Sequence, residues 1–340
     1  MNEVFQALSL VNSSSLYSGH GGIIYSKAFF LAEENFRKQW LATVSLDLDS
    51  QSPELIAGLG GLLLAVLKYS PTESLPAEDL ILDAILSQIE FSEHGCYWIV
   101  DVEQILGPIR QAVPQNLLKM EVKVADLFGA VNLGFSHGLA GLVFVLSQYA
   151  LLRPSRLGKV VPVLAGLSEY LIYASDRTPS GDIPAHFFNH EYVKVFKSGV
   201  SQQAWCYGTP GISMALLWAA IALQREDYRS KAWELFLIWN KNMKKKMSLD
   251  NPFFCHGYAG LADICRFFYN ETHRKEAREQ WLYWLQVMKT YKAVSSKSRG
   301  FYEGGLLEGF LGVAAVSQCD EPKNWESDWS ILFGTAKITT

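Results

Sequence analysis

Two cysteines and a histidine stand at matching places in a pattern that recurs along this chain. Cys206 lies in the segment WCYGTPG, residues 205–211, and Cys255 lies in CHGYAG, residues 255–260, where His256 follows it directly. Each cysteine stands two residues before the first glycine of a Gly-x-x-Gly step. Two thiolates and an imidazole suit zinc, and three protein ligands without a fourth are typical of a catalytic zinc site with an open coordination position.

These residues also have a simpler interpretation, because buried cysteines are common in protein cores and a histidine there can be a hydrogen-bonded core residue. The matched positions in two motifs favour the metal site instead. The remaining cysteines stand at no equivalent position and are predicted to lie in the core; they are Cys96, Cys265 and Cys319. We therefore predict one zinc ion held by Cys206, Cys255 and His256.

The Gly-x-x-Gly step occurs six times, at residues 19–22, 58–61, 138–141, 208–211, 257–260 and 309–312. An apolar stretch of helical length follows nearly every step, and longer amphipathic stretches such as Pro76 to Ile89 lie between them. Alternating apolar and amphipathic helices indicate two layers with the apolar set inside. The repeat predicts an all-α fold, an α/α toroid (a double-layer helical barrel) of about six to seven helix-hairpin repeats.

Two stretches depart from the helical pattern. Gly95 to Asp101 is β-branched and aromatic and predicts a strand or hairpin. Residues 175–203 contain prolines and glycines and predict a long loop or small insertion, which in a compact domain is often functional. No linker divides the chain, so we expect residues 1–340 to form a single domain.

The residues before each glycine step can be compared across the repeat. Those directly before the first glycine are Ser18, Ala57, His137, Tyr207, His256 and Glu308. We expect these side chains to face a shared central cavity at one end of the ring. His137 is a candidate acid or base, because imidazole titrates near neutral pH, although a hydrogen-bonded core histidine is the alternative. We interpret Glu308 as a carboxylate at a helix N-terminus, His20 as structural, and assign no role to His186 and His190.

Composition narrows the class of protein. The chain has 340 residues and a net charge of −4, so no basic field favours nucleic acid or an anionic membrane. The first ten residues lack the pattern of a secretory signal, and no apolar run approaches the roughly 20 residues that span a bilayer. Five cysteines in a long chain do not resemble a disulfide framework. We predict a cytoplasmic protein with no integral membrane segment.

The segments 205–211 and 255–260, together with GFSHGLAG at 134–141, resemble the signatures of the LanC family of lanthipeptide cyclases. The resemblance runs from about Tyr17 to Val316 through the glycine repeat. It implies an α-toroid with one zinc ion at the three residues named above. It also implies a precursor peptide that bears cysteine thiols and dehydroalanine or dehydrobutyrine, and a lanthipeptide dehydratase as a partner.

The resemblance implies a reaction as well. Zinc binds the substrate cysteine and removes its proton, and the thiolate adds to the β-carbon of the dehydro residue to give an enolate that must be protonated. His137 matches the motif histidine of the family and is the expected acid or base. Tyr207 and Trp205, beside the first ligand, are expected to shape the pocket.

Two further site residues depart from the family pattern. Gln202 stands where the family usually has arginine, and Glu54 stands where it usually has aspartate. Glutamate keeps the carboxylate with a slightly longer reach, whereas glutamine keeps hydrogen bonding but loses a permanent charge.

Two other functions stay open. One is a LanC-like zinc protein that binds a peptide or small thiol without cyclising it, which the changes at Gln202 and Glu54 would allow. The other is a toroid glycosidase or prenyltransferase-type enzyme that shares only the architecture. A glycosidase needs paired carboxylates, for which Glu54 and Glu308 are the candidates.

Overall fold

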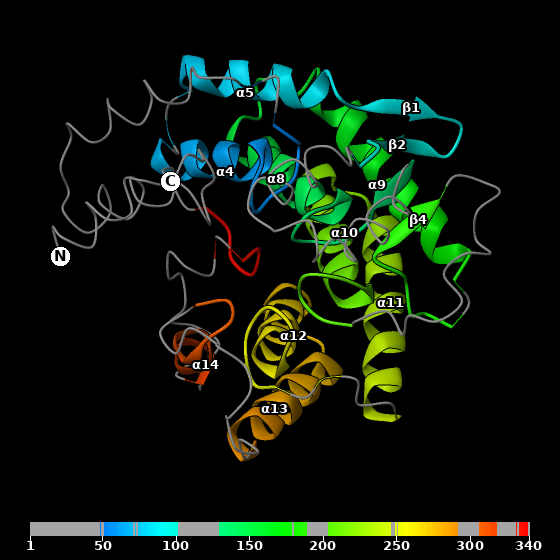
Figure 1. The fold of residues 1–340 in the computed structure, drawn as a ribbon, viewed down its shortest axis with the longest axis vertical. Helices are drawn as coiled ribbons and strands as arrows, with labels where there is room; N and C mark the ends of the chain where they lie inside the picture. The colour runs from blue at the N-terminus through cyan, green and yellow to red at the C-terminus, as the bar shows by residue number, and fades with distance from the viewer. Residues whose placement is uncertain are drawn as a thin grey trace, which may run out of the picture.

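The helices of this computed structural model form two layers, one inside the other (Figure 1). The structure describes residues 48, 51–70, 72, 74–100, 129–178, 180–188, 203–245, 249, 251–291, 306–317, 331 and 333–338. The inner helices are α4 (Leu59–Tyr69), α8 (Leu139–Leu152), α10 (Thr209–Leu223), α12 (Tyr258–Thr272) and α14 (Phe310–Ser317). The outer helices are α5 (Pro76–Leu86), α9 (Val160–Asp176), α11 (Glu226–Lys245) and α13 (Lys275–Thr290).

The order of contacts follows the repeat. Each outer helix packs on the inner helix before it, and neighbouring inner helices contact one another in chain order. Every residue of α8 from Leu139 to Ala150 is buried, as is every residue of α10 from Thr209 to Ala220. A helix that is apolar all round must be covered on all sides, which explains why these helices form the inner layer. The predicted all-α toroid is confirmed by this architecture and by the structural comparison below.

The glycine steps place the helix starts. The residue before α4, α8, α10 and α12 is the first glycine of a step, namely Gly58, Gly138, Gly208 and Gly257. The second glycine lies against the backbone of the preceding turn. A Cβ added at Gly211 would lie 2.5 Å from the Trp205 carbonyl oxygen, and one at Gly260 would lie 2.2 Å from that of Phe254. A side chain at either glycine would open the turn that carries Cys206 or Cys255.

Backbone hydrogen bonds join equivalent turns of neighbouring repeats. The Ile56 amide donates to the Ser136 carbonyl at 3.1 Å, and the Ser136 amide donates to the Cys206 carbonyl at 3.2 Å. The Cys255 amide donates to the Leu307 carbonyl at 2.9 Å. All five residues stand two positions before the first glycine of their step. These bonds support the view that the turns form one connected layer at one end of the ring.

Two short antiparallel sheets accompany the helices. β1 (Glu90–Ser92) pairs with β2 (Gly95–Tyr97), which confirms the hairpin predicted near residue 95. β3 (Ala130–Asn132) pairs with β4 (His186–Phe188). The predicted loop at 175–203 therefore contains a strand after the end of α9, while residues 189–202 lie outside the described part. So do the first glycine step with His20, and His190 and Cys319.

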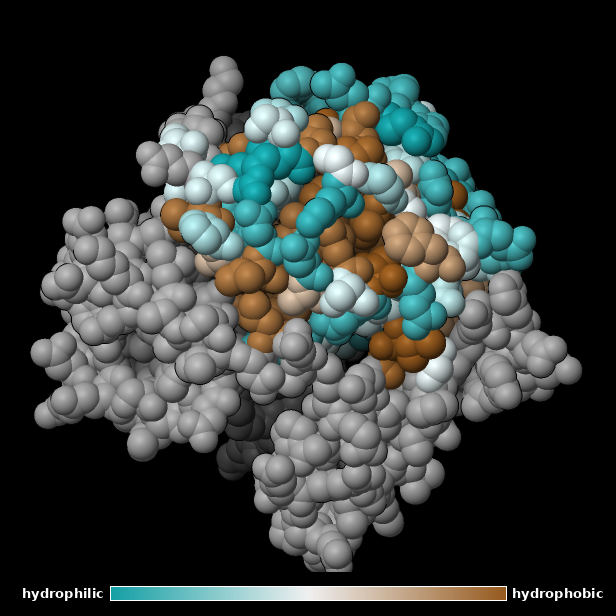
Figure 2. Space-filling model, turned by 90° about the horizontal axis from the view of Figure 1, so that it is seen from above, coloured by the Kyte–Doolittle hydropathy of each residue, from teal (hydrophilic) through white to brown (hydrophobic). Residues whose placement is uncertain are grey.

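The outer face that carries α5 and the β1–β2 hairpin is seen from above in Figure 2, where hydrophilic side chains surround a more hydrophobic middle. Leu80 and Phe91 are the large apolar side chains exposed on these two elements. Among the described residues, none of the helices combines the length and the apolar character needed to cross a bilayer.

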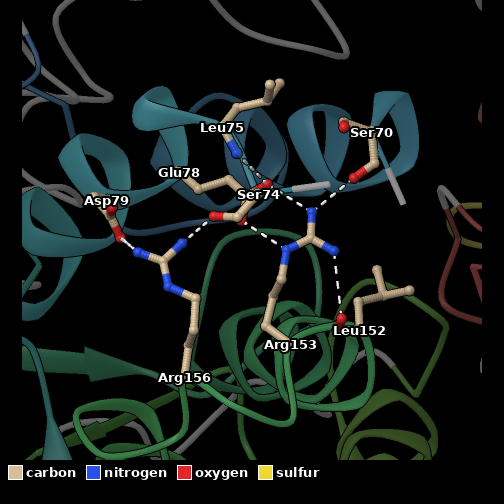
Figure 3. Close-up of polar contacts among 8 residues, drawn as sticks. All are labelled: Ser70, Ser74, Leu75, Glu78, Asp79, Leu152, Arg153 and Arg156. Carbon is tan, nitrogen blue, oxygen red and sulfur yellow. Dashed lines mark hydrogen bonds and ion pairs between the residues drawn. The ribbon is translucent and has the colours of Figure 1, made fainter. Parts of the chain in front are cut away.

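A buried ion pair ties three helices together (Figure 3). Arg153, directly after α8, binds the Glu78 carboxylate of α5 through Nε at 2.9 Å and Nη2 at 2.6 Å. Its Nη2 also donates to the carbonyl of Ser70, directly after α4, at 2.6 Å. The two charged side chains are 5% and 0% exposed. Arg156, one turn further on, makes a similar pair with Asp79 and Ser74 at the surface.

We expect Arg153→Ala to lower the free energy of unfolding by about 3–5 kcal/mol, because it leaves the Glu78 carboxylate buried without its cation. Arg156→Ala is the matched control, and an exposed pair contributes at most about 1 kcal/mol. Urea unfolding followed by circular dichroism measures both. Equal losses in the two variants would show that burial does not increase the contribution of the Arg153–Glu78 pair to the free energy of unfolding.

Candidate functional site

The three predicted metal ligands come together at the starts of α10 and α12. The ligand atoms of Cys206, Cys255 and His256 all lie within 4.8 Å of one another. The Cys206 Sγ is 2.8 Å from Nδ1 of His256. Both cysteines are buried, and the His256 side chain is 35% exposed. Elsewhere in the described ranges, no other cluster of three histidine, cysteine or acidic side chains has this geometry.

The pKa shifts of the clustered side chains are those expected where a cation would be bound. The hydrogen bond with Cys206 and then burial raise the pKa of the Cys255 thiol far above its usual range. The hydrogen bond with Cys255 also raises the pKa of His256. Two adjacent thiolates are unfavourable in a buried place, and a divalent cation removes that penalty while it displaces the protons. Two sulfurs and one ring nitrogen form a donor set that zinc prefers.

Glu308 lies on the other side of the histidine. Its Oε1 is 3.5 Å from Nε2 of His256, whereas Nδ1 faces the thiol. A carboxylate on the second ring nitrogen is the usual way in which proteins orient a metal-binding histidine. Sequence reasoning assigned Glu308 to a helix N-terminus, and it does stand just before α14. Glu308 and His256 both stand directly before the first glycine of a step. This shared position was the sequence signal that their side chains could lie close together.

A second histidine is held by a carboxylate. Nδ1 of His137 lies 2.6 Å from Oε2 of Glu54. The Glu54 carboxylate also accepts hydrogen bonds from the amides of Ile56 at 3.1 Å and Ala57 at 3.0 Å. These bonds fix a buried carboxylate, while the His137 side chain is 42% exposed. The Nδ1 contact leaves Nε2 as the nitrogen of His137 that is available to a substrate.

Tyr207 connects the two halves of the site. It directly follows Cys206, and its ring stacks near that of His137 with centroids 6.3 Å apart. Burial, followed by the charge of Cys206, raises the pKa of Tyr207 to about 12, although hydrogen bonds with Ser136 and Asn132 act in the opposite direction. The hydroxyl therefore keeps its proton near neutral pH.

His186 is a neighbour that sequence reasoning left without a role. Its ring centroid lies 6.4 Å from that of Tyr207. Burial, helped by the charge of His137, lowers the pKa of His186 to about 4, so the ring is neutral at physiological pH. The pairing of β4 with β3, in which His186 is opposite Asn132, brings it here. The only sequence signal for a position in the site was that His186 is a histidine within the predicted long loop.

Trp205 and Gln202 are the remaining predicted site residues. Trp205 is fully buried, and its ring packs against Phe135 and Phe254. It therefore supports the Cys206 turn from behind. Gln202 lies outside the described residues.

The fold and the site together define an α/α toroid with a candidate thiolate–imidazole metal centre and a histidine–carboxylate pair at the helix starts. Lanthionine synthetase C-like proteins match residues 1–327 of this sequence. The chain belongs to that family.

Two similar proteins agree with this assignment. The nisin biosynthesis protein NisC of Lactococcus lactis subsp. lactis is 24% identical over 325 residues, which cover 89% of this chain and 73% of that protein. A solved structure of nisin cyclase matches with a TM-score of 0.69 and 21% identity, over 98% of this chain and 83% of that chain. The structural match shows the shared toroid fold.

Proposed function

We propose that this chain is a zinc-dependent lanthipeptide cyclase. It adds cysteine thiols of a precursor peptide to dehydroalanine or dehydrobutyrine residues of the same peptide and so forms lanthionine or methyllanthionine rings. The observation that carries the proposal is the convergence of Cys206, Cys255 and His256 beside the His137–Glu54 pair. Membership of the lanthionine synthetase C-like family and the names of the nisin relatives support a peptide substrate.

The cysteines and the two histidines have different tasks in this proposal. One zinc ion held by Cys206, Cys255 and His256 would lower the pKa of a substrate thiol and so supply a thiolate nucleophile. The glycine turns hold the two cysteines at the helix starts, and Glu308 orients the His256 ring.

His137 moves the proton. The addition transfers the thiol hydrogen to the α-carbon of the dehydro residue while sulfur bonds to the β-carbon, so no atom is lost. His137 accepts a proton or returns it to the enolate carbon through its available nitrogen. Glu54 fixes the orientation of the ring through its contact with Nδ1. The longer glutamate thus still reaches the histidine, in place of the usual aspartate of the family.

The remaining residues shape and support the site. Tyr207 places its ring near that of His137, and Trp205 holds the Cys206 turn in place. We propose Gln202 as an uncharged hydrogen-bond partner of the substrate or its enolate. We further propose that the protein acts in the cytoplasm, where thiols stay reduced, and that a lanthipeptide dehydratase supplies the peptide.

The test is an incubation with a dehydrated precursor peptide that contains unreacted cysteines. A cyclase removes the thiols without a change of peptide mass, which alkylation followed by mass spectrometry detects. If the protein retains zinc while the thiols persist in a range of precursors, it binds a peptide or small thiol without cyclising it. Freshly purified protein without zinc would contradict both functions.

A further inference from the structure

The end of the described chain lies among the inner helices, where its red trace is surrounded by α4, α8, α10, α12 and α14 (Figure 1). We call residues 331 and 333–338 the C-terminal plug. We infer that the C-terminal plug holds the two cysteine-bearing turns from behind and so sets how tightly the site binds metal. This inference rests on the proposed metal site and concerns residues that do not touch the metal.

The C-terminal plug is largely buried, apart from Lys337, and is tied to three inner helices. Its Ile331, Phe333, Thr335 and Ile338 are all exposed by 6% or less. Hydrogen bonds hold this segment in place. Trp218 of α10 donates to the Gly334 carbonyl at 2.6 Å, and the Ile338 amide donates to Gln148 of α8 at 3.1 Å.

The third tie involves a buried charge on α12. The Thr335 hydroxyl donates to Oδ2 of Asp263 at 2.6 Å, while Nε of Arg266 donates to Oδ1 of the same carboxylate at 2.8 Å. A buried carboxylate needs hydrogen bonds at both oxygens to offset its desolvation. The C-terminal plug therefore completes a polar group inside the ring.

Phe333 links the C-terminal plug to the metal ligands. Its ring packs on Phe254, with centroids 4.4 Å apart, and meets the edge of Trp205 at 5.6 Å. Its carbonyl accepts a hydrogen bond from Nε1 of Trp205 at 2.9 Å. Trp205 directly precedes Cys206, and Phe254 directly precedes Cys255. One side chain thus supports both cysteine turns at once, and these turns belong to different repeats.

The backbone next to Phe333 is shaped for this close fit. Gly334 has φ +74°, in the left-handed region that favours glycine. A Cβ at Gly334 would lie 2.4 Å from Cζ of Phe135, whose ring also packs on Trp205. The C-terminal plug thus lies in close contact with the rings behind the cysteines. The distance between the two thiols therefore depends on the C-terminal plug.

The test compares Phe333→Ala with Ile338→Ala in the full chain. Both remove a buried apolar side chain of the C-terminal plug, but only Phe333 contacts the residues beside the ligands. Competition with a chromogenic chelator measures the zinc affinity, and the absorption spectrum of the cobalt-substituted protein reports the ligand geometry. We expect Phe333→Ala to weaken zinc binding about 10–100-fold, the range for partners behind metal ligands, and to change the cobalt spectrum.

The control variant should lose stability and keep the wild-type zinc affinity and cobalt spectrum. Phe333→Leu, which fills part of the space, should recover part of the affinity and keeps the test usable if the alanine variant does not fold. Wild-type affinity in both Phe333 variants, or equal weakening in Ile338→Ala, would overturn the inference. If the wild-type chain binds zinc but does not cyclise peptides, only the proposed function fails. A wild-type chain that binds no zinc overturns both.

Discussion

Cys206→Ala is expected to remove both the bound zinc and the cyclisation activity. The variant leaves Cys255 and His256 as the two remaining protein ligands of the proposed site. Because even a change in the residues behind metal ligands weakens binding roughly 10–100-fold, loss of a ligand itself should reduce zinc below detection after dialysis. Elemental analysis of the purified protein and the thiol assay with a dehydrated precursor measure the two effects.

Cys265→Ala is the matched control for this prediction. Cys265 is also a buried cysteine, but it lies within α12 and its thiol is near the Asn240 side chain. Its loss should lower stability slightly and leave zinc and activity unchanged. Retention of one zinc per chain in Cys206→Ala, with normal folding by circular dichroism, would place the metal elsewhere and contradict the proposed site.

The ring and the cluster of candidate metal ligands were predictable because their determinants are local in sequence. A glycine is needed at Gly211 and Gly260 since each lies against a carbonyl only six residues earlier. The same short segments carry Cys206 and Cys255, so the repeat that reveals the helix starts also reveals the ligands. Apolar inner helices such as α10 are likewise visible as continuous apolar runs.

The rest of the site depends on contacts between distant parts of the chain. His186 reaches Tyr207 through the register of β4 on β3, which no local pattern encodes. The hydrogen bonds of the C-terminal plug to Trp218 and Gln148 join residues 116 and 190 positions apart. Trp205 is fully buried against Phe135 and Phe254, so its place behind Cys206 also depends on contacts with other parts of the chain. A sequence read segment by segment could not supply these placements.

His137→Asn is expected to slow cyclisation by about 10²–10⁴-fold, the usual contribution of general acid–base catalysis. Zinc content should not change, because His137 is not among the three clustered ligands. Asparagine can fill much of the same space but cannot exchange a proton near neutral pH. Initial rates of thiol loss at saturating peptide, with metal analysis of the same samples, separate the two quantities.

Variants of Glu54 test whether the carboxylate acts through this histidine. Glu54→Gln keeps hydrogen-bonding groups but removes the carboxylate that contacts Nδ1 of His137, so its rate should fall between those of the wild type and His137→Asn. In the double variant, the Glu54 change should add little to the loss from His137→Asn, because two residues that act as one unit are not additive. Additive losses would mean that Glu54 serves only to hold the turn before α4 through its bonds to the Ile56 and Ala57 amides. Loss of zinc in His137→Asn would instead assign this histidine to the metal, and the proton would then need another carrier.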